Sequence, residues 1–308
     1  MANRIKEKYM AGKRYFDYPM LFLVIFLICF GLVMIYSTSS YKSTVTYGNS
    51  YHWLLRQAVA IVLGAVAMVV CCKLDYRIIK SEKFGNGCYW ASIILLVLVL
   101  IIGAAKKGAV RWISIAGFQF QPSEVSKILV VIYLANRLSA NAHKIRTFKD
   151  SIVIVLPTVP IIALIVTQNL STALVVCSMI GVMLFVVSPK MKELMLTAGG
   201  GIILLFVYLL TANSYRNERV QIWLHPESHK KGFQTMQALY AIGSGGIFGK
   251  GLGQSMQKMG FIPESHNDMI FSIICEELGL FGAVCLILVF VALIFRMLLI
   301  ALNTEDLF

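Results

Sequence analysis

The sequence has few charged residues and few long polar stretches. Charged residues make up 14% of the 308 residues and apolar residues 58%, whereas an average soluble domain carries about 25% charged residues. Acidic residues number only 15, against 28 lysines and arginines. A soluble helix would alternate polar and apolar faces with a 3.6-residue period, and the apolar blocks of this chain do not. The composition therefore excludes a soluble globular protein and favours an integral membrane protein.

Motifs for metals, nucleotides and nucleic acids are also missing. The seven cysteines lie in or beside apolar blocks without a C-x-x-C pair, which favours packing in the membrane over disulfides or a metal site. No H-E-x-x-H occurs. In the glycine-rich run Gly243–Gly253, Lys250 is followed by glycine, which breaks a phosphate loop, and Met256 replaces the third glycine of a dinucleotide motif. No basic face carries interleaved aromatic residues, so nucleic acid is not an expected partner.

Apolar blocks of roughly the 20 residues that a membrane-spanning helix needs alternate with short charged segments. The predicted fold class is all-α: a polytopic integral membrane protein with about eight transmembrane helices. Residues 1–308 form one membrane domain, with a large loop at 211–268 between helices 7 and 8. The first block is too long for a signal peptide and lacks an A-x-A-like cleavage site, so it is interpreted as an uncleaved helix. The blocks are Pro19–Ser37, Gln57–Cys72, Cys88–Ala104, Pro122–Ala135, Ser151–Thr167, Thr172–Val187, Leu194–Leu210 and Met269–Phe295.

The distribution of lysine and arginine predicts the orientation, because these residues gather in cytoplasmic loops. A cytoplasmic tail at residues 1–18 gives short outer loops with few basic residues, and the opposite orientation reverses the bias. The outer loops then hold only Lys42, Arg56, Lys106, Lys107 and Arg111. The inner segments hold Arg4, Lys6, Lys8, Lys13, Arg14, Lys73, Arg77, Lys80, Lys83, Arg137, Lys144, Arg146, Lys149, Lys190 and Lys192.

Two outer regions, 106–121 and 211–268, are too rich in detail to be plain connectors. The second holds enough apolar residues to argue against disorder, and a short amphipathic helix is expected at about Gly232–Ile242. The glycine-rich run that follows is interpreted as a tight, close-packed turn. Close approach of its backbone to a ligand is the alternative.

Acidic residues inside the spans are functional candidates, because charges in a bilayer are costly. Glu124 and Lys127 share one face of a helix that Pro122 begins, so they form either a local ion pair or part of a site. Glu276 and Glu277 lie two turns inside the last span, where each charge costs roughly 2.5–3.5 kcal/mol on insertion scales. They must pair, become protonated or face water, and a structural ion pair with another span is the simplest interpretation.

Asp268 stands at the mouth of the last span. It is either the N-cap of that helix or, if Asn267 caps the helix, a free carboxylate. His266 is the histidine next to this carboxylate, and a lone histidine in a loop is usually a solvated polar group.

Several long motifs in order resemble the SEDS family (shape, elongation, division and sporulation), the lipid II polymerases of bacterial wall synthesis. The resemblance covers nearly the whole chain and is greater for the division and sporulation branches, through Asp17–Ser37 and Gln254–Lys258. The chain departs from the family at Asn267 and Met269, where Thr and Phe are usual, and at Gln168-Asn-Leu-Ser. The family has ten spans, so its helices 9 and 10 are expected to be absent here. The motifs are Gly108-Ala-Val-Arg-Trp-Ile, Phe120-Gln-Pro-Ser-Glu-Val-Ser-Lys127, Gly232–Gly246, Gly249-Lys-Gly-Leu-Gly253 and Phe261–Gly279.

The resemblance implies a peptidoglycan glycosyltransferase that joins lipid II units into glycan strands at the outer face of the bacterial cytoplasmic membrane, in division or sporulation. Asp268 would be the general base for the acceptor hydroxyl. Cations would stabilise the leaving pyrophosphate. Glu276 and Glu277 would support the site from behind or be structural. The substrate-binding candidates are Arg111, Glu124, Lys127, Arg219, Lys250 and His266.

The same resemblance implies the partners. They are lipid II, membrane lipid, a class B penicillin-binding protein acting as transpeptidase, and other divisome proteins. No nucleotide sugar is needed, and no cofactor is certain, although a divalent cation, Mg²⁺ or Mn²⁺, could help at the pyrophosphate. Two alternatives stay open: a lipid II flippase, and a non-catalytic scaffold for the transpeptidase.

Overall fold

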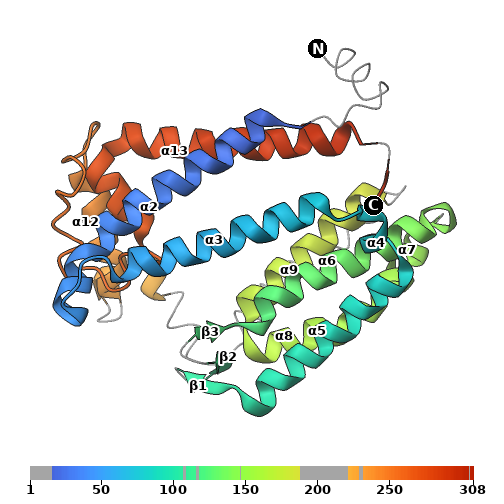
Figure 1. Ribbon diagram of the computed structural model, residues 1–308. Coiled ribbons are helices and arrows are strands. Elements are labelled where there is room, and N and C mark those ends of the chain that lie inside the picture. The colour runs from blue at the N-terminus through green and yellow to red at the C-terminus, as the bar shows by residue number, and fades with distance from the viewer. Residues whose placement is uncertain are drawn as a thin grey trace. The chain divides into compact units, whose positions relative to one another are not determined.

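The computed structural model describes residues 16–106, 109–115, 118–145, 147–187, 221–228, 232–304 and 306–308. They belong to two compact units (Figure 1). The first unit draws on residues 1–72 and 212–305, and the second on 73–211 and 306–308.

Six helical segments among the described residues are long and apolar enough to cross a membrane, which confirms a polytopic helical membrane protein. The expected block at 122–135 does form a helix, α6 (Pro122–Asn141), but it does not reach this apolar level because it carries Glu124, Lys127 and Arg137. The expected block at 194–210 lies outside the described residues. The six segments are Tyr18–Tyr47, His52–Lys73, Glu82–Ile102, Lys149–Gln168, Leu170–Val187 and Ile270–Leu302.

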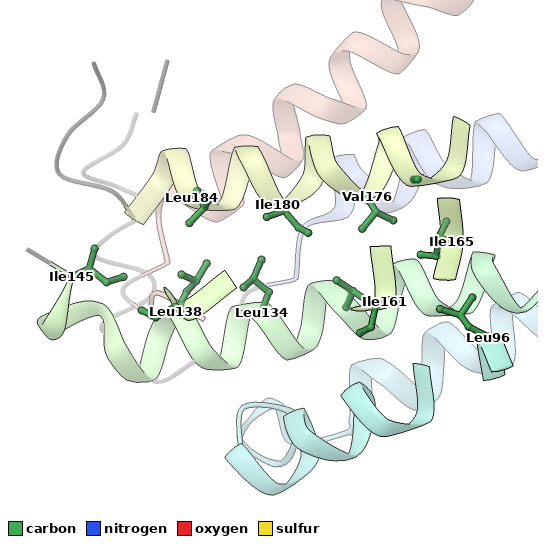
Figure 2. Packing of buried hydrophobic residues seen from close by; sticks show 12 residues of the cluster. Leu96, Leu134, Leu138, Ile145, Ile161, Ile165, Val176, Ile180 and Leu184 are labelled. Carbon is green, nitrogen blue, oxygen red and sulfur yellow. The ribbon is translucent and has the colours of Figure 1, made fainter. Parts of the chain in front are cut away.

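The second unit is a helical bundle with a small sheet. Buried aliphatic side chains of α5 (Glu82–Ile102), α6, α8 (Val159–Gln168) and α9 (Leu170–Val187) form its core, and Figure 2 shows those of α6 and α9 pointing toward one another. Because these neighbours cover α6, that helix can carry more polar residues than a lipid-facing span. The shorter helices are α4 (Tyr76–Ile79), η1 (Ala142–Lys144), α7 (Phe148–Val155) and η2 (Leu156–Thr158).

A three-stranded antiparallel sheet follows α5 in the same unit. Its strands are β1 (Ala104–Lys106), β2 (Ala109–Ile115) and β3 (Phe118–Phe120), in the order β1-β2-β3. The outer region expected at 106–121 therefore belongs to a β-meander, a feature that the all-α prediction did not include.

The first unit contains α2 (Tyr18–Tyr47), α3 (His52–Lys73), η3 (Pro226–Ser228), α12 (Phe233–Ser244) and α13 (Ile270–Leu302). Helix α12 confirms the amphipathic helix expected at this place. Helix α2 packs along α13 (Figure 1) through Met34, Ile274 and Leu286. No residue of α3 is buried, and an apolar helix so exposed suits a bilayer rather than water.

Contacts at both ends show that α2 and α13 run antiparallel. At one end, Asp17 caps α2 through the backbone N–H of Met20 and forms an ion pair with Arg296. At the other end, the Ser265 hydroxyl donates a hydrogen bond to the carbonyl of Thr38, just before α13 begins. The start of α13 therefore lies on the same side of the membrane as the end of α2.

Candidate functional site

A break in α13 receives the glycine-rich turn. Gly279 has φ 68° and ψ −170°, which interrupts the helix and leaves backbone groups on both sides without helical partners. Backbone groups of residues 246–251 satisfy them with four hydrogen bonds. The bonds run from Lys250 N to Glu276 O (2.9 Å), Gly251 N to Glu277 O (2.9 Å), Leu280 N to Gly246 O (2.9 Å) and Phe281 N to Ile247 O (3.0 Å).

This close approach explains two of the glycines. A Cβ atom at Gly249 would lie 2.2 Å from the carbonyl oxygen of Glu277, and one at Gly279 would lie 2.3 Å from the backbone nitrogen of Gly249. Both residues also have positive φ, which side chains rarely tolerate. The close-packed turn is confirmed here, since these backbones approach α13 itself.

Glu276 fixes the next part of the loop. Its carboxylate is fully buried and lies 2.7 Å from the ammonium of Lys250. The carboxylate also accepts hydrogen bonds from the hydroxyl of Ser255 and from the backbone N–H groups of Met256 (3.2 Å) and Gln257 (3.4 Å). The buried Glu276 carboxylate thus accepts hydrogen bonds from several groups of the loop, and these bonds connect residues 250–257 to α13.

Glu277 makes a second ion pair, in which both side chains are buried, and this pair also reaches α2. Its carboxylate is fully buried and lies 2.8 Å from the Lys258 ammonium, whose side chain is only 5% exposed. The Ser37 hydroxyl of α2 donates to both carboxylate oxygens, at 2.8 and 2.7 Å. The expected ion pairing of the two glutamates is confirmed, but their partners are loop lysines rather than another span.

Asp268 differs from these two acids. It is exposed, and no partner contacts its carboxylate within the described residues. The N-cap position of α13 is Met269, without a side-chain cap, so the structure shows neither Asp268 nor Asn267 as the N-cap. Asn267 instead donates to Glu264 at 3.2 Å. The structure therefore presents Asp268 as an exposed carboxylate just before α13, without a partner among the described residues.

His266 is buried, and the expectation of a solvated histidine is wrong. It is 7% exposed, and its ring lies 4.7 Å from that of Trp53 between centroids. Neither ring nitrogen has a hydrogen-bond partner within the described part of the chain. Burial lowers the pKa of His266, the charge of Lys42 lowers it further, and Glu264 opposes the shift. The neutral imidazole is therefore favoured near neutral pH.

The remaining candidates are spread over the chain. Glu124 and Lys127 form an ion pair of 2.8 Å in the first turns of α6, in the second compact unit. Asp268, His266 and Lys250 belong to the first unit, and the ammonium of Lys250 already pairs with Glu276. Arg111 lies on β2, but its side chain is outside the described part, as is the whole of Arg219. The binding roles of these residues stay predictions.

Sequence reasoning missed Lys258, Ser37 and Trp53. Lys258 could have been found, because two adjacent buried carboxylates require two cations and the preceding loop offers Lys250 and Lys258. Ser37 and Trp53 gave no such signal. Within the ranges that the structure describes, no three His, Cys, Asp or Glu side chains gather in a way that could hold a metal ion.

Comparison with known proteins gives consistent relatives. Residues 18–308 match the family described as cell cycle protein, which groups FtsW, RodA and SpoVE. The probable peptidoglycan glycosyltransferase FtsW of Geobacter metallireducens is 35% identical, over 94% of this chain and 78% of that protein. Stage V sporulation protein E of Bacillus subtilis is 34% identical, over 95% of this chain and 81% of that protein.

Solved structures also resemble this chain. One comes from a peptidoglycan synthase complex that coordinates polymerization and crosslinking. It has a TM-score of 0.75 and 28% identity, and the match covers 96% of this chain and 81% of that one. Another is the crystal structure of the rod shape determining protein RodA of Thermus thermophilus. Its TM-score is 0.66 at 26% identity, and the match covers 96% of this chain and 78% of that one.

Proposed function

The chain belongs to the FtsW/RodA/SpoVE (SEDS) family of cell cycle proteins, and from this membership and the free carboxylate of Asp268 we propose that it is a peptidoglycan glycosyltransferase. It polymerises lipid II into glycan strands at the outer face of the cytoplasmic membrane, in division or sporulation. The single observation that carries the assignment of the base is the contrast at the start of α13. Glu276 and Glu277 are buried in ion pairs, whereas Asp268 is exposed and unpaired within the described residues.

The reaction requires a base and a cation. Asp268 accepts the proton of the acceptor sugar hydroxyl while the oxygen of that hydroxyl bonds to the anomeric carbon of the donor. The bond from that carbon to the lipid pyrophosphate breaks, and the pyrophosphate leaves with the electron pair. Cationic groups stabilise its charge, and Arg111, Lys127 and Arg219 are the candidates, with Glu124 orienting Lys127. A divalent cation, Mg²⁺ or Mn²⁺, is a further candidate at the pyrophosphate.

The loop of residues 246–258, which is bonded to α13, would help to position the catalytic group. A catalytic group must be held close to its productive position, and small displacements are costly in rate. Four backbone hydrogen bonds and two ion pairs with buried glutamates fix residues 246–258 to α13. The segment that follows carries Asp268, and it is itself joined to α2 by the hydrogen bond from Ser265 to the carbonyl of Thr38.

The proposed orientation places residues 1–18 in the cytoplasm and Asp268 outside. Lipid II, a class B penicillin-binding protein and other divisome proteins are the proposed partners. The resemblance to a chain from a peptidoglycan synthase complex supports a partnership of this kind.

Polymerisation by the purified full chain tests the function. Lipid II is supplied in detergent, where no bilayer exists and nothing needs to be flipped, and glycan polymer is measured with and without the transpeptidase partner. Polymer is the expected result. Absence of polymer under both conditions, together with scrambling of lipid II in vesicles, would assign a flippase instead.

A further inference from the structure

A groove of about 590 Å³ lies between the second half of α2 and residues 252–259, and it is separate from Asp268. Its α2 wall runs from Val33 to Val45 at spacings of three and four residues, which is one face of the helix. Leu252 and Met259 stand on the opposite wall. The volume is within the roughly 300–1,000 Å³ of small-molecule sites.

The α2 wall of the groove carries both apolar and hydroxyl-bearing residues. Val33 and Val45 line its two ends, and Ser37, Ser40 and Thr44 lie between them. Helix α2 has 30 residues and is therefore about 45 Å long, whereas the hydrocarbon core is about 30 Å thick. Counted from Tyr18, about 20 residues cross this core, so Ser37 stands close to the boundary between hydrocarbon and head groups.

Lys258 lies at this boundary and borders the groove. Its buried ammonium donates to Ser37 (3.1 Å) and Glu277 (2.8 Å). An ammonium has three hydrogens, and the third has no acceptor among the described residues. A buried charged donor without an acceptor is costly, so a ligand oxygen at this point would be favoured.

We infer that this groove binds the isoprenoid phosphate part of a lipid-linked saccharide. A phosphate oxygen accepts the third hydrogen of Lys258, the isoprenoid chain runs past Val33 and Leu252, and the saccharide side extends toward Tyr41 and Thr44. The inference rests on the proposed function, since substrate and leaving group of that reaction both contain polyprenyl pyrophosphate. Glu277 already neutralises Lys258, so hydrogen bonding and apolar contact, rather than net charge, hold the ligand.

Photo-crosslinking tests the site in the full chain. Benzoylphenylalanine is introduced at Leu252 or, as control, at Ile287 of α13; these residues are 55% and 49% exposed. The protein is placed in phosphatidylglycerol nanodiscs with radiolabelled polyprenyl pyrophosphate that carries no saccharide. Crosslinking is expected at Leu252 and not above background at Ile287. It should change little between low and high salt, because the lysine is already neutralised.

Two threonines near the end of α2 provide matched variants. Thr44 lines the groove, whereas Thr46 is exposed outside it. Thr44→Trp fills the groove and should lower the crosslink at Leu252 by roughly tenfold, equivalent to about 1.4 kcal/mol. Thr46→Trp should leave it within about twofold, less than 0.5 kcal/mol on the same scale.

Equal crosslinking at Leu252 and Ile287, or equal loss in both tryptophan variants, would overturn the inference. So would competition by excess unlabelled phosphatidylglycerol as strong as that by unlabelled polyprenyl pyrophosphate, because the groove would then hold ordinary phospholipid. Asp268→Asn should retain the crosslink. A specific crosslink in a protein that makes no polymer would reject the proposed function and keep the site, and the reverse result would reject only the site.

Discussion

The acidic side chains around the start of α13 have different surroundings although they are close in the sequence. Glu276 and Glu277 are fully buried and paired with lysines, while Asp268 is exposed. The carboxylate oxygens of Glu276 and Glu277 are occupied by hydrogen-bond donors of the loop and of α2. Asp268 has no such partner within the described residues, so it is the carboxylate here that an acceptor hydroxyl can reach.

Asp268→Asn should abolish most of the polymerisation without unfolding the protein. The change keeps the side-chain size and removes the basic oxygen, so the rate should fall by something like 10²–10⁴-fold, as for loss of a general base. Glu264→Gln is the matched control, because Glu264 is an exposed carboxylate of the same loop. Initial rates of polymerisation and thermal unfolding in detergent are measured together.

A well-folded Asp268→Asn protein with near-normal rate would reject the assignment of the base. Loss of activity in Glu264→Gln alone would move the assignment to Glu264. His266 would be the remaining candidate if both variants stayed active.

His266 should make stability depend on pH. Its pKa is lowered in the folded protein, mainly by burial, so below about 6.5 the unfolded chain binds more protons than the folded one. Stability should therefore fall as the pH decreases through about 6.5 toward the lower folded value. His266→Phe keeps a ring against Trp53 and cannot be protonated, so it should lose this part of the dependence.

Thermal unfolding midpoints of the wild type and the variant, compared between mildly alkaline and mildly acidic pH, measure the effect. Lys42 and Glu264 face His266 and stay unchanged in this comparison. His143→Phe is the control, because it makes the same substitution at an exposed histidine. Parallel profiles for wild type and His266→Phe would contradict the prediction.

At the scale of elements, the two lysine–glutamate pairs fix one loop but depend differently on their lysines. Without Lys250, Glu276 would keep Ser255 and the backbone N–H groups of Met256 and Gln257. Without Lys258, Glu277 would keep only Ser37 within the described residues. The second pair should therefore be the more sensitive one.

Lys258→Met should destabilise the protein by about 3–5 kcal/mol, as expected when one partner of a buried pair is removed. Lys250→Met is the matched control and should cost clearly less, since the Lys250 side chain is 36% exposed. Adding Glu277→Gln to Lys258→Met should recover much of the loss, because no unpaired charge remains buried. Chemical unfolding in detergent gives the double-mutant cycle, and additive losses would show that the pair is not coupled.

The elements also show which parts of the fold a sequence can reveal. Apolar block length predicted the spans, and the apolar residues of the long loop predicted α12, because both are local properties. The sheet at 104–120 and the break at Gly279 were not predicted, since they depend on pairing between backbone segments. Likewise, the two glutamates signalled a need for cations, but only packing shows that Lys250 and Lys258 supply them.

At the scale of the whole molecule, the proposed function depends on which side of the membrane Asp268 faces. Polymerisation requires Asp268 to face the compartment where glycan strands are built, outside the cell. The antiparallel contacts of α2 and α13 place the end of α2 and Asp268 on one side, and Asp17 and Arg296 on the other. The bias of lysine and arginine predicts that the Asp17 side is cytoplasmic. One measurement of sidedness therefore orients the first unit.

We expect Ser228, an exposed residue of η3, to lie outside the cell. In a background without the native cysteines, Ser228→Cys should react with a membrane-impermeant thiol reagent on intact protoplasts. Lys83→Cys, at the start of α5 in a segment predicted to be cytoplasmic, is the control and should react only after lysis. The reverse pattern, with Ser228→Cys labelled only after lysis, would place Asp268 in the cytoplasm and reject it as the base of an external polymerase. Labelling of both positions before lysis would show that the protoplasts leak. The labelling of Lys83→Cys on intact protoplasts is therefore measured first, and it gives the background for Ser228→Cys.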